Sequence, residues 1–234
     1  MLTIAVIGSK NSGKTTVTEV LIRELTKKGY KVAAVKHIPE QNFTIDTEGK
    51  DTWRHAKAGA SKVISVAPKE IAVIHKVETE KLSLEDILQH CEDADIVILE
   101  GFKSLIGTNP KILKIVTVKN LEEAREASKI FRPIIAFSGT AADRLSKENF
   151  AIPIIDALNE TEKLVKLVEE KIGQIRKESS ENFALYVDNR QVPLKPFVQR
   201  IMKSSIIAMA STLKGVEVSP DDKVIVKIKK WGSS

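Results

Sequence analysis

An eight-residue segment near the N-terminus constrains the fold of this chain more than any other feature. Residues 8–15 read Gly-Ser-Lys-Asn-Ser-Gly-Lys-Thr, a full match to the phosphate-binding loop of nucleoside triphosphatases. An apolar run at residues 2–7 precedes the loop, and apolar residues at helical spacing follow it. Strand, loop and helix therefore come in the order that this loop requires, and the chain is predicted to begin as an α/β fold.

The residue types of the loop predict its chemistry. Gly8 and Gly13 allow the backbone to turn so that consecutive N–H groups point at a polyphosphate. The ammonium of Lys14 is expected to reach the β and γ phosphates, and the hydroxyl of Thr15 to ligate Mg²⁺. We therefore expect this end of the chain to hold a nucleoside triphosphate with Mg²⁺.

Composition is typical of a globular cytoplasmic protein. The chain has 234 residues, of which 42% are hydrophobic and 29% charged, enough for one ordinary domain and a small additional unit. No apolar run approaches the roughly 18 residues of a membrane helix, and no basic region of a secretory signal precedes Leu2. The single Cys91 excludes a disulfide framework. We expect a cytoplasmic location and no membrane contact.

Short apolar runs and helical repeats continue the α/β pattern through most of the chain. Strands are predicted at residues 31–36, 95–100, 114–118, 133–137 and 152–155, and helices at 51–58, 83–91, 121–130 and 144–149. Two further runs, 62–67 and 71–75, predict an antiparallel hairpin attached to the sheet. The expected fold is a three-layer phosphate-loop fold with a mostly parallel sheet and an added hairpin.

The pattern changes near residue 177. A long helix is predicted from Asn159, and the polar stretch 177–182 separates a domain of residues 1–177 from a small α+β unit, residues 183–234. The small unit is predicted to contain a hairpin, an apolar-striped helix and a final strand at 224–228. Residues 177–234 hold ten Lys or Arg against six Asp or Glu, without the aromatic interleaving typical of nucleic-acid binding. We expect this unit to pack on the main domain or on a second copy.

Glu100 ends the most strand-like segment of the chain, whose unbroken apolar run fits a central strand buried on both faces. In phosphate-loop proteins an acidic residue at this place holds Mg²⁺ next to the hydroxyl of the loop. Glu100 also precedes a glycine turn at Gly101. We therefore predict that Glu100 and Thr15 lie on the metal side of the nucleotide.

A second polar segment, residues 36–60, is dense in groups that bind anions or metals. Lys36, the first residue of this segment, is also the last residue of the second predicted strand. It therefore lies at the rim where ligands bind in open α/β sheets. Residues that can contact an anionic ligand, orient water or extend a metal shell in this segment and after Glu100 are Lys36, His37, Asp46, Lys50, Asp51, Arg54 and Lys103. The spacing of His37 and His55 does not match a transition-metal site.

Several segments occur together in an order that resembles the family of molybdopterin-guanine dinucleotide biosynthesis protein B, called MobB. The matching segments are the phosphate loop, Val-Lys-His at 35–37, Gly-Lys-Asp-Thr-Trp-Arg-His at 49–55, Ala-Gly-Ala at 58–60, Leu-Glu-Gly-Phe-Lys at 99–103 and Pro-Lys-Ile at 110–112. The resemblance covers about residues 1–175. The remaining C-terminal extension suggests an archaeal-type member and takes no role from the family.

The resemblance implies a GTP-binding, weakly GTP-hydrolysing accessory protein that forms a homodimer. It would take part in attaching GMP to the molybdopterin cofactor, beside a separate MobA-like guanylyltransferase and with molybdoenzymes as further partners. By matching positions, the resemblance implies that the nucleotide-binding residues are Gly8, Asn11, Ser12, Gly13, Lys14, Thr15 and Thr16. It implies that Glu100 is the acidic residue on the metal side.

The base that the site reads is not evident from the residues. The sequence Thr-Val-Lys-Asn at 117–120 lacks the aspartate with which many GTPases read guanine, and Asp143 either supplies that carboxylate or caps a helix. Three other functions stay open beside the GTPase. They are a small-molecule kinase with an anionic acceptor, a nucleotide-gated adaptor without significant catalysis, and a C-terminal unit that binds RNA or a partner chain. A metal-delivery GTPase is disfavoured because His-rich and Cys-x-x-Cys ligands are missing.

Overall fold

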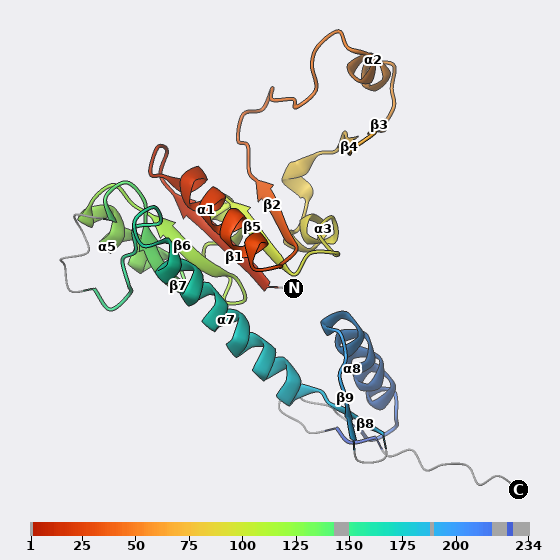
Figure 1. The fold of residues 1–234 in the computed structure, drawn as a ribbon. Helices are drawn as coiled ribbons and strands as arrows, with labels where there is room; N and C mark the ends of the chain where they lie inside the picture. The colour runs from red at the N-terminus through yellow and green to blue at the C-terminus, as the bar shows by residue number, and fades with distance from the viewer. Residues whose placement is uncertain (1, 143–149, 188–189, 217–223, 227–234) are drawn as a thin grey trace, which may run out of the picture. The chain divides into compact units, whose positions relative to one another are not determined.

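The chain divides into two compact units, Met1–Glu169 and Glu170–Ser234. The computed structural model describes residues 2–142, 150–187, 190–216 and 224–226 (Figure 1). The helix expected at 144–149 and Asp143 lie outside these residues. The division falls within the long helix α7 (Thr161–Asn182), which includes the polar stretch 177–182.

A five-stranded parallel sheet forms the centre of the first unit (Figure 1). Its strands, in spatial order, are β2 (Val32–Lys36), β5 (Ile96–Glu100), β1 (Leu2–Gly8), β6 (Leu113–Thr117) and β7 (Ile134–Ser138). The apolar runs of β1 and β5 are buried on both faces, as parallel strands between helices require. This order places the strand before the phosphate loop directly beside the strand that ends in Glu100.

The strand expected at 152–155 is reduced to one parallel bridge between Ile154 and Phe137. Phe137 donates its N–H to the carbonyl of Pro153, and Ile155 donates to the carbonyl of Phe137. Pro153 has no N–H of its own, so it cannot donate to a ladder. The segment therefore extends the sheet by a single bridge only.

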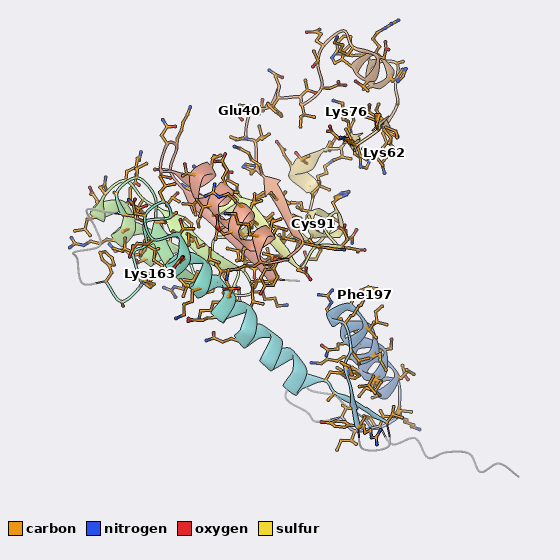
Figure 2. All side chains as sticks on the ribbon, viewed as in Figure 1. Glu40, Lys62, Lys76, Cys91, Lys163 and Phe197 are labelled. Atoms are coloured by element: carbon orange, nitrogen blue, oxygen red, sulfur yellow. The ribbon has the colours of Figure 1, made fainter. Side chains whose placement is uncertain are left out.

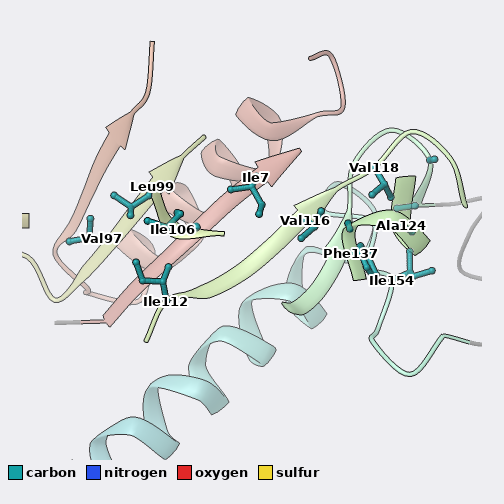
Figure 3. Packing of buried hydrophobic residues seen from close by; sticks show 14 of the residues in the cluster. Ile7, Val97, Leu99, Ile106, Ile112, Val116, Val118, Ala124, Phe137 and Ile154 are labelled. Carbon is teal, nitrogen blue, oxygen red and sulfur yellow. The ribbon is translucent and has the colours of Figure 1, made fainter. Parts of the chain in front are cut away.

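Helices cover both faces of the sheet. On one face, α3 (Leu84–Gln89), α4 (Lys103–Ile106) and α5 (Leu121–Ile130) pack against the side chains that alternate along the strands, and Figure 3 shows this cluster. On the other face, α1 (Lys14–Lys27) buries its apolar stripe, and an ion pair of 2.9 Å between Lys28 and Glu169 joins its end to α7. The predicted three-layer α/β fold with a mostly parallel sheet is confirmed.

The predicted hairpin is present, but it forms a sheet of its own. Strands β3 (Lys62–Ala67) and β4 (Glu70–His75) pair antiparallel with each other, and α2 (Asp51–Lys57) packs beside them. A one-turn 3₁₀ helix at Thr79–Lys81 follows. One face of the hairpin is apolar and exposed, with Ile64, Val66, Ile71 and Val73 each more than half exposed.

The second unit contains a short antiparallel pair, β8 (Leu185–Val187) and β9 (Arg190–Val192), followed by α8 (Pro196–Ser211). The expected hairpin and helix are therefore seen. Phe197, at the start of α8, is largely exposed (Figure 2). Of the strand expected at 224–228, residues 224–226 have no regular secondary structure, and the others lie outside the described residues. Among the helices of the described residues, none has the length and apolarity to cross a bilayer.

Candidate functional site

The phosphate loop lies at the carboxyl end of β1, where it connects β1 to α1. Asn11 and Gly13 both have positive φ angles, 60° and 94°, which turn the backbone before the helix begins. Gly8 has no room for a side chain, because a Cβ there would meet the hydroxyl and carbonyl of Thr117. The loop is thus shaped by its own glycines and by close contact with β6.

Ser12 connects the loop to strand β6 of the sheet. The residue is 1% exposed, and its hydroxyl lies 2.8 Å from the carbonyl oxygen of Ser9 and 2.6 Å from the hydroxyl of Thr117. The hydroxyl of Thr117 lies 3.2 Å from the carbonyl oxygen of Ile7. Sequence reasoning placed Ser12 in the loop but gave Thr117 no role, because nothing in the pattern indicates that β6 would pair beside the loop.

Gly139, at the end of β7, closes the loop from the other side. The N–H of Thr140 donates to the carbonyl of Ser12, at 3.3 Å, and a Cβ on Gly139 would meet that same carbonyl. The φ angle of Gly139 is 106°. This position therefore requires glycine both for its conformation and for its contact with the loop.

Lys14 is folded back onto the loop. Its ammonium donates to the carbonyl of Ser9 at 2.6 Å and that of Gly8 at 3.4 Å. Burial lowers the pKa of Lys14, and the positive charges of Lys103, Lys36 and Lys119 lower it further, while Glu100 acts in the opposite direction. The positive charges of these lysines act on Lys14 together, which favours an anionic ligand with more than one charge.

Glu100 lies where the sequence predicted it, beside the loop. Its carboxyl oxygen Oε1 accepts a hydrogen bond from the hydroxyl of Thr15 at 2.9 Å and lies 3.2 Å from the ammonium of Lys36. The residue is 7% exposed. The structure therefore joins the first strand's loop, the second strand's end and the β5 carboxylate in one cluster.

The donors in this cluster fit Mg²⁺. Thr15 and Glu100 offer a hydroxyl and a carboxylate, the hard oxygen ligands that Mg²⁺ takes alongside water and substrate phosphates. Their oxygens are already in contact, so both can serve the same ion. Among residues 2–142, 150–187, 190–216 and 224–226, no group of three or more His, Cys, Asp or Glu is arranged to hold a metal.

His37 directly follows β2 and Lys103 follows the turn after β5, so both lie at the rim where these neighbouring parallel strands end. The N–H of His37 donates to the carbonyl of Glu100 at 2.9 Å, and the rings of His37 and Phe102 lie 5.1 Å apart. Phe102 has a φ of 59°, a left-handed conformation that costs free energy in a non-glycine residue. Lys103 follows it as the first residue of α4.

A second polar network, unforeseen from the sequence, links the loop to α5. Glu123 accepts from the Ser9 hydroxyl at 3.1 Å and from the backbone N–H of Lys119 at 2.9 Å. Although partial burial acts in the opposite direction, these hydrogen bonds hold the pKa of Glu123 below its usual value. Asn120 caps α5, since its side-chain oxygen accepts from the N–H of Glu123. Asp143, the other residue considered for base reading, lies outside the described residues.

Four predicted site residues belong to the segment before and within α2, and their interactions are local. Asp46 accepts from the hydroxyl of Thr52 at 2.8 Å, and its Oδ2 has no hydrogen-bond partner. Arg54 lies 3.7 Å from Asp51 one helical turn away, with both side chains exposed. Lys50 directly precedes α2. The structure does not join these four side chains to the cluster around Glu100.

Proteins similar to this chain share a description. The family model of molybdopterin guanine dinucleotide synthesis protein B, MobB, matches residues 3–138. A Methanocaldococcus jannaschii protein that provisionally carries the name molybdopterin-guanine dinucleotide biosynthesis adapter protein is 31% identical over 243 residues, covering 98% of this chain and 99% of that protein. The Haemophilus influenzae protein of that name is 39% identical over 113 residues, 47% of this chain and 61% of the relative.

Solved structures show the same fold. The crystal structure of Bacillus subtilis MobB superposes with a TM-score of 0.57 at 23% identity, covering 73% of this chain and 97% of that structure. A crystal structure of molybdopterin-guanine biosynthesis protein B gives a TM-score of 0.54 at 24% identity, covering 72% of this chain and 97% of that structure. The match to the Methanocaldococcus relative continues through the C-terminal unit.

Proposed function

Since this chain belongs to the MobB family, we propose that it is a GTP-binding adapter in molybdopterin guanine dinucleotide synthesis. It binds GTP with Mg²⁺ at the phosphate loop and hydrolyses it slowly. The protein acts beside a guanylyltransferase of the MobA type, and its ligand beyond the nucleotide is the molybdopterin cofactor. Molybdoenzymes are its further partners.

The contact between Thr15 and Glu100 is the observation that carries the nucleotide part of this proposal. A hydroxyl at the start of α1 and a carboxylate at the end of β5 meet at 2.9 Å beside the loop. Bound Mg²⁺ would neutralise developing phosphate charge. Lys14, now held by two backbone carbonyls, would exchange them for phosphate oxygens, and the loop N–H groups would hold the remaining charge.

Hydrolysis is slow in this proposal because the residues of the loop cluster supply lysines rather than an arginine. Rapid phosphoryl transfer to water in related folds depends on an arginine that stabilises the transition state. Arg54, the arginine that the sequence suggests near the motifs, is 71% exposed at its side chain and lies beside Asp51. The nucleotide thus serves to change the state of an adapter rather than to sustain turnover.

The exposed face of the hairpin supports the proposed homodimer. Ile64, Val66, Ile71 and Val73 form two cross-strand pairs on one face, between 56% and 75% exposed. An apolar patch of β-branched residues on a two-stranded sheet favours burial against another protein surface. A second copy offers the same patch, so two hairpins can cover each other around a twofold axis.

Equilibrium binding of GTP and ATP to the full chain, with Mg²⁺, tests the nucleotide part of the proposal. We expect GTP to bind more tightly, and Lys14→Met to weaken binding by at least about a hundredfold, since it removes the ammonium beneath the phosphates. Lys27→Met, at the exposed end of α1, is the matched control and should leave the affinity unchanged. Equal affinity of the wild type and Lys14→Met contradicts the proposal.

A measurement of phosphate release distinguishes the proposed adapter function from a kinase function. The lysines whose charges act on Lys14 suit a second anionic ligand, and a kinase would transfer phosphate to that ligand. We expect slow phosphate release from GTP that a pterin phosphate does not convert into a phosphorylated product. A stoichiometric phosphorylated pterin, detected by mass spectrometry, would instead establish the kinase. Co-sedimentation with a guanylyltransferase, compared with and without GTP, tests the partnership.

A further inference from the structure

Lys36 and Glu100 occupy the same position on neighbouring strands. Lys36 ends β2, Glu100 ends β5, and the two residues are direct register partners in a parallel pair. Side chains at such positions leave the sheet on the same face, with their backbones about 4.8 Å apart. The sheet itself therefore holds this lysine beside this carboxylate.

One carboxylate oxygen of Glu100 contacts both Thr15 and Lys36. Oε1 lies 2.9 Å from the Thr15 hydroxyl and 3.2 Å from the Lys36 ammonium. Glu100 has a side chain only 9% exposed, so its charge is poorly solvated and gains from a nearby cation. Lys36 supplies that cation in the structure.

The ammonium of Lys36 can leave this position easily. Its side chain is 56% exposed and stands on β2, an edge strand of the sheet. Four rotatable bonds allow the ammonium to reach a new position without moving the backbone. Lys36 is also one of the charges that act on Lys14, whose ammonium marks the expected position of the β and γ phosphates.

A metal ion and an ammonium cannot share one carboxylate oxygen without strong repulsion. Mg²⁺ held by Thr15 and Glu100 would compete with the Lys36 ammonium for this carboxylate, because Thr15 and Lys36 both contact its Oε1. The displaced ammonium would then find its nearest uncompensated negative charge on the terminal phosphate of the bound nucleotide.

We propose that Lys36 is an exchangeable counter-ion of the phosphate site. It neutralises Glu100 before metal arrives, and it contacts the terminal phosphate of a nucleoside triphosphate once Mg²⁺ occupies Glu100. Lys36 thereby distinguishes a triphosphate from a diphosphate, because a diphosphate lacks the terminal group. This assignment rests on the proposed binding of a nucleotide with Mg²⁺.

The test compares full-length wild type with Lys36→Met in equilibrium binding of GDP and of a non-hydrolysable GTP analogue. With Mg²⁺, the variant should lose about tenfold in affinity for the triphosphate, about 1.4 kcal/mol, and less than about twofold for the diphosphate. The Mg²⁺ concentration that half-saturates the GDP complex should fall in the variant, since no ammonium must be displaced. Equal losses for both nucleotides, or no loss, overturn the proposal.

Two further variants show whether the effect of Lys36→Met comes from the lost charge, from a disturbed fold or from the position of the lysine. Lys36→Arg keeps the charge and should retain most of the preference for the triphosphate, and its folding can be compared by circular dichroism. Lys31→Met removes a lysine from just before the same strand, at its opposite end, and should change neither affinity. A Lys31→Met effect as large as that of Lys36→Met would mean that general charge decides the affinity, which overturns the proposal.

The outcome also distinguishes this assignment from the proposed function. If neither the wild type nor Lys14→Met binds a nucleotide, both the proposed function and the role of Lys36 are overturned. Binding that depends on Lys14 but is indifferent to Lys36 leaves the nucleotide site intact and overturns the role of Lys36 alone.

Discussion

The hydroxyls of Ser12 and Thr117 lie 2.6 Å apart beneath the phosphate loop, although 105 positions separate them in the chain. Both residues are only 1% exposed. Each hydroxyl has one hydrogen, so the two hydroxyls can donate two hydrogen bonds among three close contacts, which are the contact between them and those to the carbonyls of Ser9 and Ile7. The loop is thus held in place by the neighbouring strand β6.

Replacing Thr117 by Val tests this hold. The near-isosteric change leaves a buried Ser12 hydroxyl without its side-chain partner, so we expect a loss of about 1–3 kcal/mol in the free energy of unfolding. Urea denaturation measures the loss, and nucleotide titration should show weaker binding. Thr117→Ser keeps the hydroxyl and should lose less stability. A Thr117→Val variant as stable as the wild type would show that the contact contributes nothing.

Gly139→Ala should damage the loop from its other side. The added Cβ meets the carbonyl oxygen of Ser12, and the residue has a φ of 106°. We expect a lower unfolding temperature and weaker nucleotide binding.

Gly173→Ala is a matched control on a helix. Gly173 lies inside α7, where an added Cβ meets no atom within 4 Å. Alanine there should raise the free energy of unfolding by up to about 1 kcal/mol, because it favours the helix. Similar effects of the two substitutions would contradict the special role of Gly139.

Lys114 gives the protein a pH-dependent term in its stability. The side chain is fully buried at the start of β6, and its ammonium donates to the carbonyls of Asn109, Ile112 and Arg132. Burial lowers the pKa of Lys114 to about 8, whereas an unfolded lysine titrates near 10.4. Between these values the unfolded chain binds more protons, so this group's contribution to stability increases with pH.

Lys114→Met isolates that contribution. The variant leaves three carbonyls without their donor and should lose on the order of 2–4 kcal/mol at pH 7. Urea denaturation at pH 7.5 and pH 10 should show the wild type gaining stability relative to the variant as the pH rises. If the unfolding free energy of the wild type relative to that of the variant became smaller from pH 7.5 to pH 10, this would contradict the lowered pKa of Lys114.

Val73→Lys should weaken self-association. The substitution places a charge at the centre of the exposed hairpin face, opposite Ile64, where burial against a second copy would become costly. We expect the dimer dissociation constant to increase by at least about tenfold in sedimentation velocity. Lys69→Ala, in the turn between β3 and β4, should leave it unchanged. A monomeric wild type at all concentrations would remove the basis for the dimer.

Local pattern was enough to predict the elements that carry the site. The apolar run before Gly8 and the run ending in Glu100 gave two strands, and the parallel fold brings such strand ends to one rim. The sequence could therefore predict that Thr15 and Glu100 lie close together, and the two side chains are in contact.

The partners of the loop could not be predicted in this way. The roles of Thr117, Gly139 and Glu123 depend on which strands are neighbours, and strand order is a property of the whole sheet rather than of a local window. The same limit explains why the hairpin at 62–75 was expected beside the main sheet. Its apolar alternation predicts a paired strand but does not say with which sheet it pairs.

The chain leaves the sheet immediately after Lys36 and returns to it only at Ile96, having formed α2, the hairpin and α3 in between. Lys36, the proposed nucleotide contact, is thus joined by one continuous segment to the hairpin that carries the exposed apolar face. A change in the conformation of residues 37–50 on binding of a second protein to the hairpin would alter the segment attached to Lys36. Thermodynamic linkage makes such an effect reciprocal, so partner affinity and nucleotide affinity would change by the same factor.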